Sequence, residues 1–112
     1  MLRHALDGLT VLDFTHIGAG PTCTMLLADM GARVIKVEPP QGELGRQLGP
    51  AWIGDDSALY HAFNRNKLGL SLDLKSACGL DVARRLAAAG RPGSTRLYAR
   101  LRPHTWRHPR EV

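Results

Sequence analysis

The most constraining feature of the sequence is one segment in which an apolar strand runs through a glycine-rich turn into a helix. Residues 9–14 are apolar and β-branched, as in a buried strand. The turn at residues 17–21 ends in Pro21, which suits the first position of a helix because its missing N–H would have no partner there. Apolar residues then recur at helical spacing over residues 22–30, and Gly31 follows as a helix stop.

The same alternation continues along the chain. Residues 32–38 and 68–74 alternate as two further strands. Ser57 is placed to cap a short helix, and Ser76 is placed to cap one that runs to about residue 89. Strand–helix–strand order implies parallel pairing with right-handed crossovers. The expected fold class is therefore α/β, a partial Rossmann-like parallel sheet with flanking helices.

Residues 39–57 separate the second expected strand from the short helix. They are rich in glycine and proline, and we expect a long loop there. Asp55 and Asp56 lie within this loop and offer a pair of carboxylates for general acid–base chemistry. Two solvated carboxylates are the simpler interpretation, because charged side chains are mostly exposed.

Charge divides the chain into two parts. The formal net charge is +5, yet residues 1–90 contain equal numbers of basic and acidic side chains. The whole excess lies in residues 91–112, which hold six arginines, three prolines and no lysine. We expect this tail to be disordered, or foreign to the rest through a shifted reading frame. No pattern for a fourth strand is evident in it, so we expect a truncated three-stranded sheet with an open edge.

The overall composition excludes several classes of protein. With 112 residues, of which 44% are hydrophobic, the chain fits one globular domain. No apolar run reaches the ~18–20 residues of a membrane-spanning helix, so no membrane partner is expected. Cys23 and Cys78 are too few for a disulfide framework and are expected to be small buried residues of a cytoplasmic protein. Nucleic acid is not the expected partner, although a nucleic-acid-binding arm remains an alternative for the tail.

The turn after the first strand is the best candidate for a binding site. Its small residues let a ligand approach the backbone, and the next helix offers unpaired N–H groups to a phosphate or carboxylate. A plain tight turn is one alternative, and a small dinucleotide-binding module is another. For the second, Gly18 and Gly20 supply two of three glycines, Cys23 stands in place of the third, and Glu38 stands near the position of a ribose-binding acid. His16 lies at the same edge, where we expect a neutral hydrogen-bonding contact.

No metal ion is expected. His104 and His108 are four residues apart, as in a metal-binding pair on a helix. Pro103 and Pro109 bracket them, however, and no third ligand is evident.

Four segments together resemble one enzyme family. They are residues 6–21, 27–38, 63–67 and 70–75, which read LDGLTVLDFTHIGAGP, LADMGARVIKVE, FNRNK and LSLDLK. In this order and spacing they are similar to the opening of the family III CoA-transferases, the family of formyl-CoA transferase, carnitine CoA-transferase and α-methylacyl-CoA racemase. The resemblance covers about residues 6–89.

The resemblance implies a Rossmann-like large domain that binds coenzyme A in a homodimeric enzyme. Such enzymes move coenzyme A from an acyl-CoA to a carboxylate acceptor, whereas the racemase branch exchanges an α-proton. Lys75 suits a phosphate of coenzyme A because its ammonium is a compact positive charge. By position, the residues implied to contact coenzyme A are His16, Ile17, Gly18, Ala19, Leu72, Asp73, Leu74 and Lys75.

Two departures limit what the resemblance implies. Pro39 stands where formyl-CoA transferase has an arginine, so that contact is lost or is made by Arg46 or another basic residue. The nucleophilic aspartate of the family lies beyond the matched residues, so no catalytic residue is expected here. We expect an N-terminal fragment with part of the coenzyme A site and no activity of its own. The acyl-CoA and the acceptor are not determined by these residues.

Overall fold

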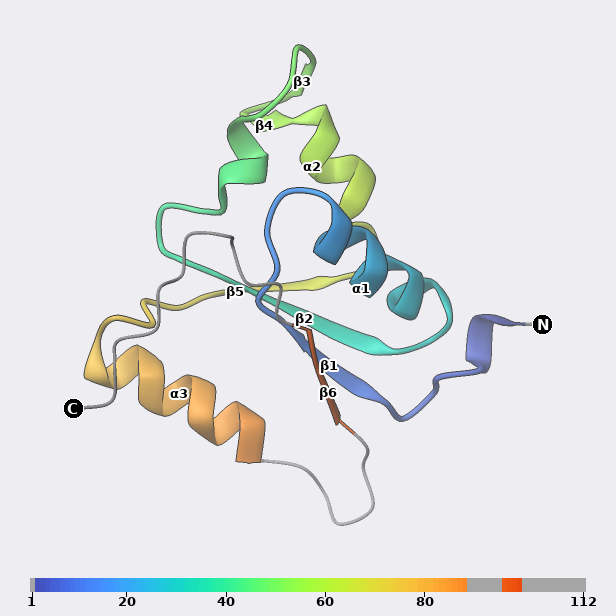
Figure 1. The fold of residues 1–112 in the computed structure, drawn as a ribbon, viewed down its shortest axis with the longest axis vertical. Helices are drawn as coiled ribbons and strands as arrows, with labels where there is room; N and C mark the ends of the chain where they lie inside the picture. The colour runs from blue at the N-terminus through green and yellow to red at the C-terminus, as the bar shows by residue number, and fades with distance from the viewer. Residues whose placement is uncertain (1, 89–95, 100–112) are drawn as a thin grey trace.

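A computed structural model describes residues 2–88 and 96–99, and within them the central element is a four-stranded parallel sheet (Figure 1). The strand order is β5-β2-β1-β6. All neighbouring strands pair in parallel, so their carboxyl ends lie at one edge of the sheet. The strands are β1 (Thr10–Asp13), β2 (Arg33–Glu38), β5 (Leu68–Ser71) and β6 (Arg96–Ala99).

Two longer helices flank the sheet. Helix α1 (Ala19–Asp29) connects β1 to β2, and helix α3 (Ala77–Ala88) lies between β5 and β6 in the chain. Because β2 and β6 flank β1 on opposite sides, right-handed crossovers place the two helices on opposite faces of the sheet (Figure 1). The short helix α2 (Ala58–Phe63) packs beside α1.

The core lies between α1 and the central strands. Val11 of β1 and Val34 of β2 are neighbours in register and are fully buried. Ala28 of α1 and Ala32 pack against them, and Leu6, Leu9 and Leu27 close the cluster from its edge. The small size of both alanines lets the helix approach the sheet closely, and burial of these apolar side chains is the main stabilising contribution to this unit.

The sequence predictions for the first three strands and for both serine caps are confirmed. The Ser57 hydroxyl accepts a hydrogen bond from the Leu59 amide, and the Ser76 hydroxyl accepts one from the Gly79 amide. Helix α1, however, begins at Ala19, two residues before Pro21, which we expected at its first position. The Gly18 carbonyl accepts hydrogen bonds from the Thr22 amide and hydroxyl, so the first helical turn closes at that glycine.

Two expectations about loops and edges are wrong. Residues 39–57 are not a structureless loop but contain η2 (Leu44–Gln47) and a hairpin of β3 (Trp52–Ile53) and β4 (Asp56–Ser57). The sheet also has a fourth strand, because β6 pairs with β1 from Thr10↔Arg96 to Asp13↔Ala99. Backbone pairing along the free side of β1 needs no side-chain pattern, which is why the composition gave no sign of it. The rest of the tail lies outside the described residues, and its disordered or foreign character stays a prediction.

The two cysteines are exposed, contrary to expectation. Cys23 lies on the outward face of α1, whose buried face carries Thr24, Met25 and Ala28. Cys78 lies in the first turn of α3, where Gly79 takes the buried position. In the described part of the chain, no helix is long and apolar enough to cross a membrane.

Gly31 provides a test of the turn between α1 and β2. It has a φ of +101°, and a Cβ added there would lie 2.6 Å from the Arg3 carbonyl oxygen and would collide with the Asp7 carboxylate. Gly8 is a matched control, with a φ of +85° and nothing within 4 Å of an added Cβ. We expect Gly31→Ala to lower the free energy of unfolding by about 2–4 kcal/mol and Gly8→Ala by about 1 kcal/mol. Urea unfolding measures both, and equal losses would contradict the close approach of the N-terminal segment to this turn.

Candidate functional site

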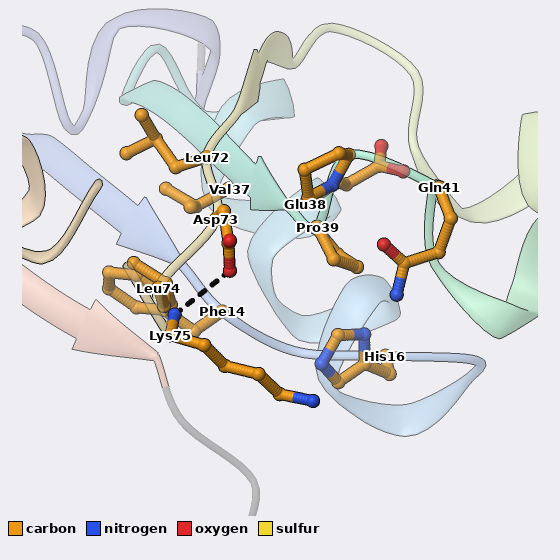
Figure 2. A pocket seen from close by; sticks show the side chains of 11 residues that line it. Phe14, His16, Val37, Glu38, Pro39, Gln41, Leu72, Asp73, Leu74 and Lys75 are labelled. Carbon is orange, nitrogen blue, oxygen red and sulfur yellow. Dashed lines mark hydrogen bonds between the residues drawn. The ribbon is translucent and has the colours of Figure 1, made fainter. Parts of the chain in front are cut away.

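A pocket of about 410 Å³ opens at the carboxyl edge of the sheet (Figure 2). Phe14 and His16 reach it from the segment after β1, residues 37–41 from the end of β2, and residues 72–75 from the segment after β5. Parallel strands bring these three segments to one edge, which is where ligand sites of α/β proteins form. Thus His16 and residues 72–75, singled out in the sequence and more than fifty positions apart, lie around one pocket.

A second hollow of about 490 Å³ lies beside the first. His16, Pro39 and Gln41 line both, so the imidazole stands between the two spaces. Ile17 lines the second hollow only. Gly18 and Ala19 line neither of the two; they form the start of α1, and a Cβ added at Gly18 would meet nothing within 4 Å. Their contact with a ligand stays a prediction.

The loop between β1 and α1 holds an unusual backbone conformation. Ile17 has a φ of +73°, which is rare for a β-branched residue and costs on the order of 1–3 kcal/mol. The Gly18 amide donates to the His16 carbonyl at 3.1 Å and closes a three-residue turn around Ile17. Contacts on either side must maintain this conformation.

One of these contacts is a buried ion pair beneath the loop. Lys36 points from β2 and is 1% exposed, and its Nζ lies 2.9 Å from Oε2 of the fully buried Glu43 side chain. The same Nζ donates to the Thr15 carbonyl at 3.0 Å. Burial alone would raise the pKa of Glu43, but the nearby His16 imidazole and Lys36 ammonium hold it below its usual value. Glu43 is therefore a carboxylate that anchors the loop after β1.

A second buried network surrounds Asp13 at the end of β1. Its carboxylate accepts hydrogen bonds from the Thr15 amide at 2.8 Å, the Thr15 hydroxyl at 2.5 Å, the Thr24 hydroxyl at 2.6 Å and Lys67 Nζ at 3.0 Å. Burial works to raise the pKa of Asp13, yet these donors lower it below the ordinary value. The network ties the end of β1 to α1 and to the segment before β5.

The segment FNRNK, which carried part of the family resemblance, has a structural role here. Lys67 Nζ also donates to the Pro21 carbonyl at 2.9 Å and to Asn64 Oδ1 at 2.8 Å. Arg65 and Asn66 both bind the carboxylate of Asp29 at the end of α1, with donor–acceptor distances of 2.6 and 2.7 Å. The segment therefore clamps both ends of α1 and holds its N-terminus beside the pocket.

Glu38, at the end of β2, is not free to bind a ribose. Arg46 donates to both of its carboxylate oxygens at 2.7 and 2.9 Å, the Tyr60 hydroxyl donates at 2.6 Å and the Glu43 amide at 3.0 Å. Burial works to raise the pKa of Glu38, but these donors hold it at about 2. Arg46 also donates to Asp56 at 2.8 Å, so Asp56 is not the solvated carboxylate we expected.

These contacts bear on two predictions from the sequence. A dinucleotide module would need Glu38 to accept hydrogen bonds from a ribose, whereas its acceptors face its own chain. Arg46 was one candidate to replace the arginine that Pro39 lacks, but its donors are directed to Glu38, Asp56 and the Tyr60 hydroxyl. Its role is to hold the segment after β2 in place.

Residues 72–75 form a tight turn between β5 and α3. The Lys75 amide donates to Asp73 Oδ1 at 3.0 Å, the dashed line in Figure 2, and the Ser76 hydroxyl donates to the Asp73 carbonyl at 2.8 Å. Lys75 is exposed, and no carboxylate in the described part of the chain pairs with its ammonium. The turn therefore presents an uncompensated positive charge at the pocket.

Sequence reasoning missed three buried charged residues at the site: Lys36, Glu43 and Lys67. The one available signal was a charged residue inside an apolar strand, since Lys36 stands between Ile35 and Val37. Its partner Glu43 lies in a segment with no regular pattern. For metals, residues 2–88 and 96–99 contain no group of three or more His, Cys, Asp or Glu able to hold an ion, and His104 and His108 lie outside the described residues.

Comparison with known proteins identifies the family of this chain. Residues 6–90 match CoA-transferase family III. The chain belongs to that family. The succinyl-CoA:glutarate CoA-transferase of Homo sapiens is 43% identical over 84 residues, which are 74% of this chain and 19% of the relative. The formyl-CoA:oxalate CoA-transferase of Rhodopseudomonas palustris (strain TIE-1) is 47% identical over 82 residues, 72% of this chain and 19% of the relative.

Two solved structures are similar to this chain in fold. A CAIB/BAIF family protein from Brucella suis is 40% identical with a TM-score of 0.69, over 74% of this chain and 23% of that chain. Rv3272 from Mycobacterium tuberculosis is 41% identical with a TM-score of 0.62, over 73% of this chain and 22% of that chain. The present chain spans about a fifth of the length of the curated relatives it matches.

The pKa of Glu38 predicts how stability depends on pH. Its folded value of about 2 lies below the ordinary 4.5, so its contribution is present above pH 4.5 and is lost as the pH falls toward 2. This shift corresponds to roughly 3 kcal/mol at neutral pH. We expect Glu38→Gln to be less stable than the unsubstituted chain at pH 7 by about that amount, with the difference shrinking between pH 4.5 and 2. Urea unfolding at several pH values measures this, and a constant difference would contradict the assignment.

The close approach of Gly79 to Asp73 predicts that α3 holds the turn at residues 72–75 in place. A Cβ added at Gly79 would collide with the Asp73 carbonyl oxygen and lie 2.7 Å from its carbon, whereas one added at Gly69 would meet nothing within 4 Å. We expect Gly79→Ala to shift the amide resonances of Asp73 and Lys75, and Gly69→Ala to leave them in place. Two-dimensional NMR measures both variants. Unchanged resonances in Gly79→Ala would show that α3 does not press on the turn.

Proposed function

We propose that the pocket at the carboxyl edge binds the coenzyme A part of an acyl-CoA. The observation that carries the proposal is the convergence of His16 and residues 72–75 around one pocket, with Lys75 at its rim and no carboxylate of the described residues paired to it. Coenzyme A has phosphates that need a positive charge and a long pantetheine arm that needs a groove. Lys75 supplies the charge, and Phe14, Val37 and Leu72 supply apolar walls.

We propose that the reaction served by this site is the transfer of coenzyme A between a thioester and a carboxylate. The names of the relatives support this, since they pair succinyl-CoA with glutarate and formyl-CoA with oxalate. An acyl-CoA racemase of the same family remains the alternative. The proposal extends to a homodimer, which the family resemblance implies, and to the cytoplasm, which the small number of cysteines favours.

We assign no catalytic residue to this chain. The buried carboxylates of Asp13, Glu38 and Glu43 are each engaged by cationic side chains, so none is offered to a substrate as a nucleophile. We therefore expect the 112-residue chain to bind coenzyme A without transferring it.

The binding proposal is tested by calorimetric titration of the 112-residue chain with coenzyme A. We expect Lys75→Ala to weaken binding about three- to tenfold, because an exposed charge-assisted contact to a phosphate is lost. Arg33→Ala is the matched control, since it removes the same charge from the exposed start of β2, at the opposite edge of the sheet. Equal losses in the two variants would indicate a nonspecific charge effect and contradict the site.

Two further titrations separate the alternatives. NADH fluorescence should remain unchanged on addition of the chain, and a saturable change would favour the dinucleotide module. Incubation with succinyl-CoA and a dicarboxylate acceptor should yield no exchanged thioester by mass spectrometry. Turnover that survives repurification would show that a catalytic group is present in this chain.

A further inference from the structure

We propose that Glu43 is a positioning residue that fixes the ring and the tautomer of His16, so that Nδ1–H faces Glu43 and the lone pair of Nε2 is presented to the ligand. The inference deepens the proposed function by naming the kind of ligand group that His16 takes. It follows from contacts on three elements that meet beneath the loop after β1.

The first step is the geometry around the imidazole. His16 Nδ1 lies 3.4 Å from Glu43 Oε2, and the His16 side chain is 43% exposed while that of Glu43 is fully buried. The ring thus has one nitrogen directed at the interior and a face open to both hollows. Figure 2 shows the ring on the same side of the pocket as Gln41 and the end of the Lys75 side chain.

The second step is the immobility of the carboxylate. The Glu43 amide is bound to Glu38 Oε2 at 3.0 Å, and Oε2 of Glu43 lies 2.9 Å from Lys36 Nζ. In the described part of the chain neither Oε1 nor Oε2 accepts a hydrogen bond, so Oε2 is held by its ionic contacts with Lys36 and His16, and a Cβ at Gly45 would collide with Oε1. Among the described residues, Lys36 and His16 are the groups that compensate this buried carboxylate, and Gly45 leaves it no room to turn away from them.

The third step is charge. Lys36 already compensates the negative charge of Glu43, so the pair does not require a positively charged imidazole. A neutral ring whose Nδ1 lies 3.4 Å from a carboxylate oxygen is more stable with its proton on Nδ1, because a lone pair there would face the negative charge, and this leaves Nε2 as an acceptor. Lys75, at the rim of the same pocket, is the group placed for a phosphate.

His16 and Lys75 therefore contact different chemical groups of the ligand. An unprotonated Nε2 accepts a hydrogen bond from an N–H or O–H group, such as the amides and hydroxyl of a pantetheine arm, and it repels phosphate oxygens. The strained backbone at Ile17 fits this role, because the turn around it directs the His16 side chain while Lys36 holds the preceding carbonyl.

The decisive experiment is long-range ¹H–¹⁵N NMR of the imidazoles in the 112-residue chain at pH 8, where ordinary histidines are neutral. The His16 signals are identified by their loss in His16→Gln. We expect the Nδ1–H tautomer, whereas free histidine prefers the Nε2–H form. An Nε2–H tautomer at His16 in the unsubstituted chain would overturn the proposal.

Variants separate positioning from general packing. Glu43→Leu should return His16 to the Nε2–H form, while Glu43→Gln, whose amide oxygen can still accept from Nδ1, should retain the Nδ1–H form. Asp56→Asn is the control, since Asp56 binds Arg46 rather than His16. A folded Glu43→Leu chain that keeps the Nδ1–H tautomer would also refute the role of Glu43.

Addition of coenzyme A to the same samples distinguishes this inference from the proposed function. Binding should shift the Nε2 resonance and leave the proton on Nδ1. If the chain does not bind coenzyme A, the proposed function fails, and the tautomer measured without ligand still decides the role of Glu43. Binding that moves the proton to Nε2 would refute the acceptor role.

Discussion

The site depends on ion pairs that are buried at the carboxyl edge of the sheet. Lys36 and Lys67 are each almost fully buried, and each must meet a carboxylate because an unpaired buried charge costs several kcal/mol. Lys36 meets Glu43 beneath the loop after β1, and Lys67 meets Asp13 at the start of that loop. Breaking either pair would free the loop that carries His16, so these ion pairs specify a conformation as well as support a fold.

The same constraint explains why a site can be built from segments far apart in the chain. The strands β1, β2 and β5 end at one edge of the sheet. The side chains just beyond them therefore lie close enough to form hydrogen bonds and ion pairs with one another. Hydrogen bonds from Arg46 and Tyr60 to Glu38 fix the segment after β2, and Asp73 fixes the turn after β5. The pocket between them is thereby largely preformed, which lowers the cost of ordering a ligand site on binding.

Several particular elements were predictable from the sequence and others were not. The strand–turn–helix opening, the alternation of Ile35 and Val37, and the two serine caps were predictable because their signals are local in sequence. Strand β6 and the β3–β4 hairpin were not, because backbone pairing at an edge imposes little on side-chain identity. The exposed cysteines were misjudged because burial of a small residue depends on which face of a helix meets the sheet.

By itself, the sequence determined an α/β fold of parallel strands and the family to which the chain belongs, since both follow from local periodicity and contiguous motifs. Only the tertiary structure decided which charged residues share a site. Glu43 lies in a segment without regular pattern, and nothing local distinguishes it from Asp55 or Asp56 in the same segment. Glu43 lies between Lys36 and His16 because three segments meet at one edge of the sheet. In that low-polarity environment a buried charge is stable only when it contacts a compensating group.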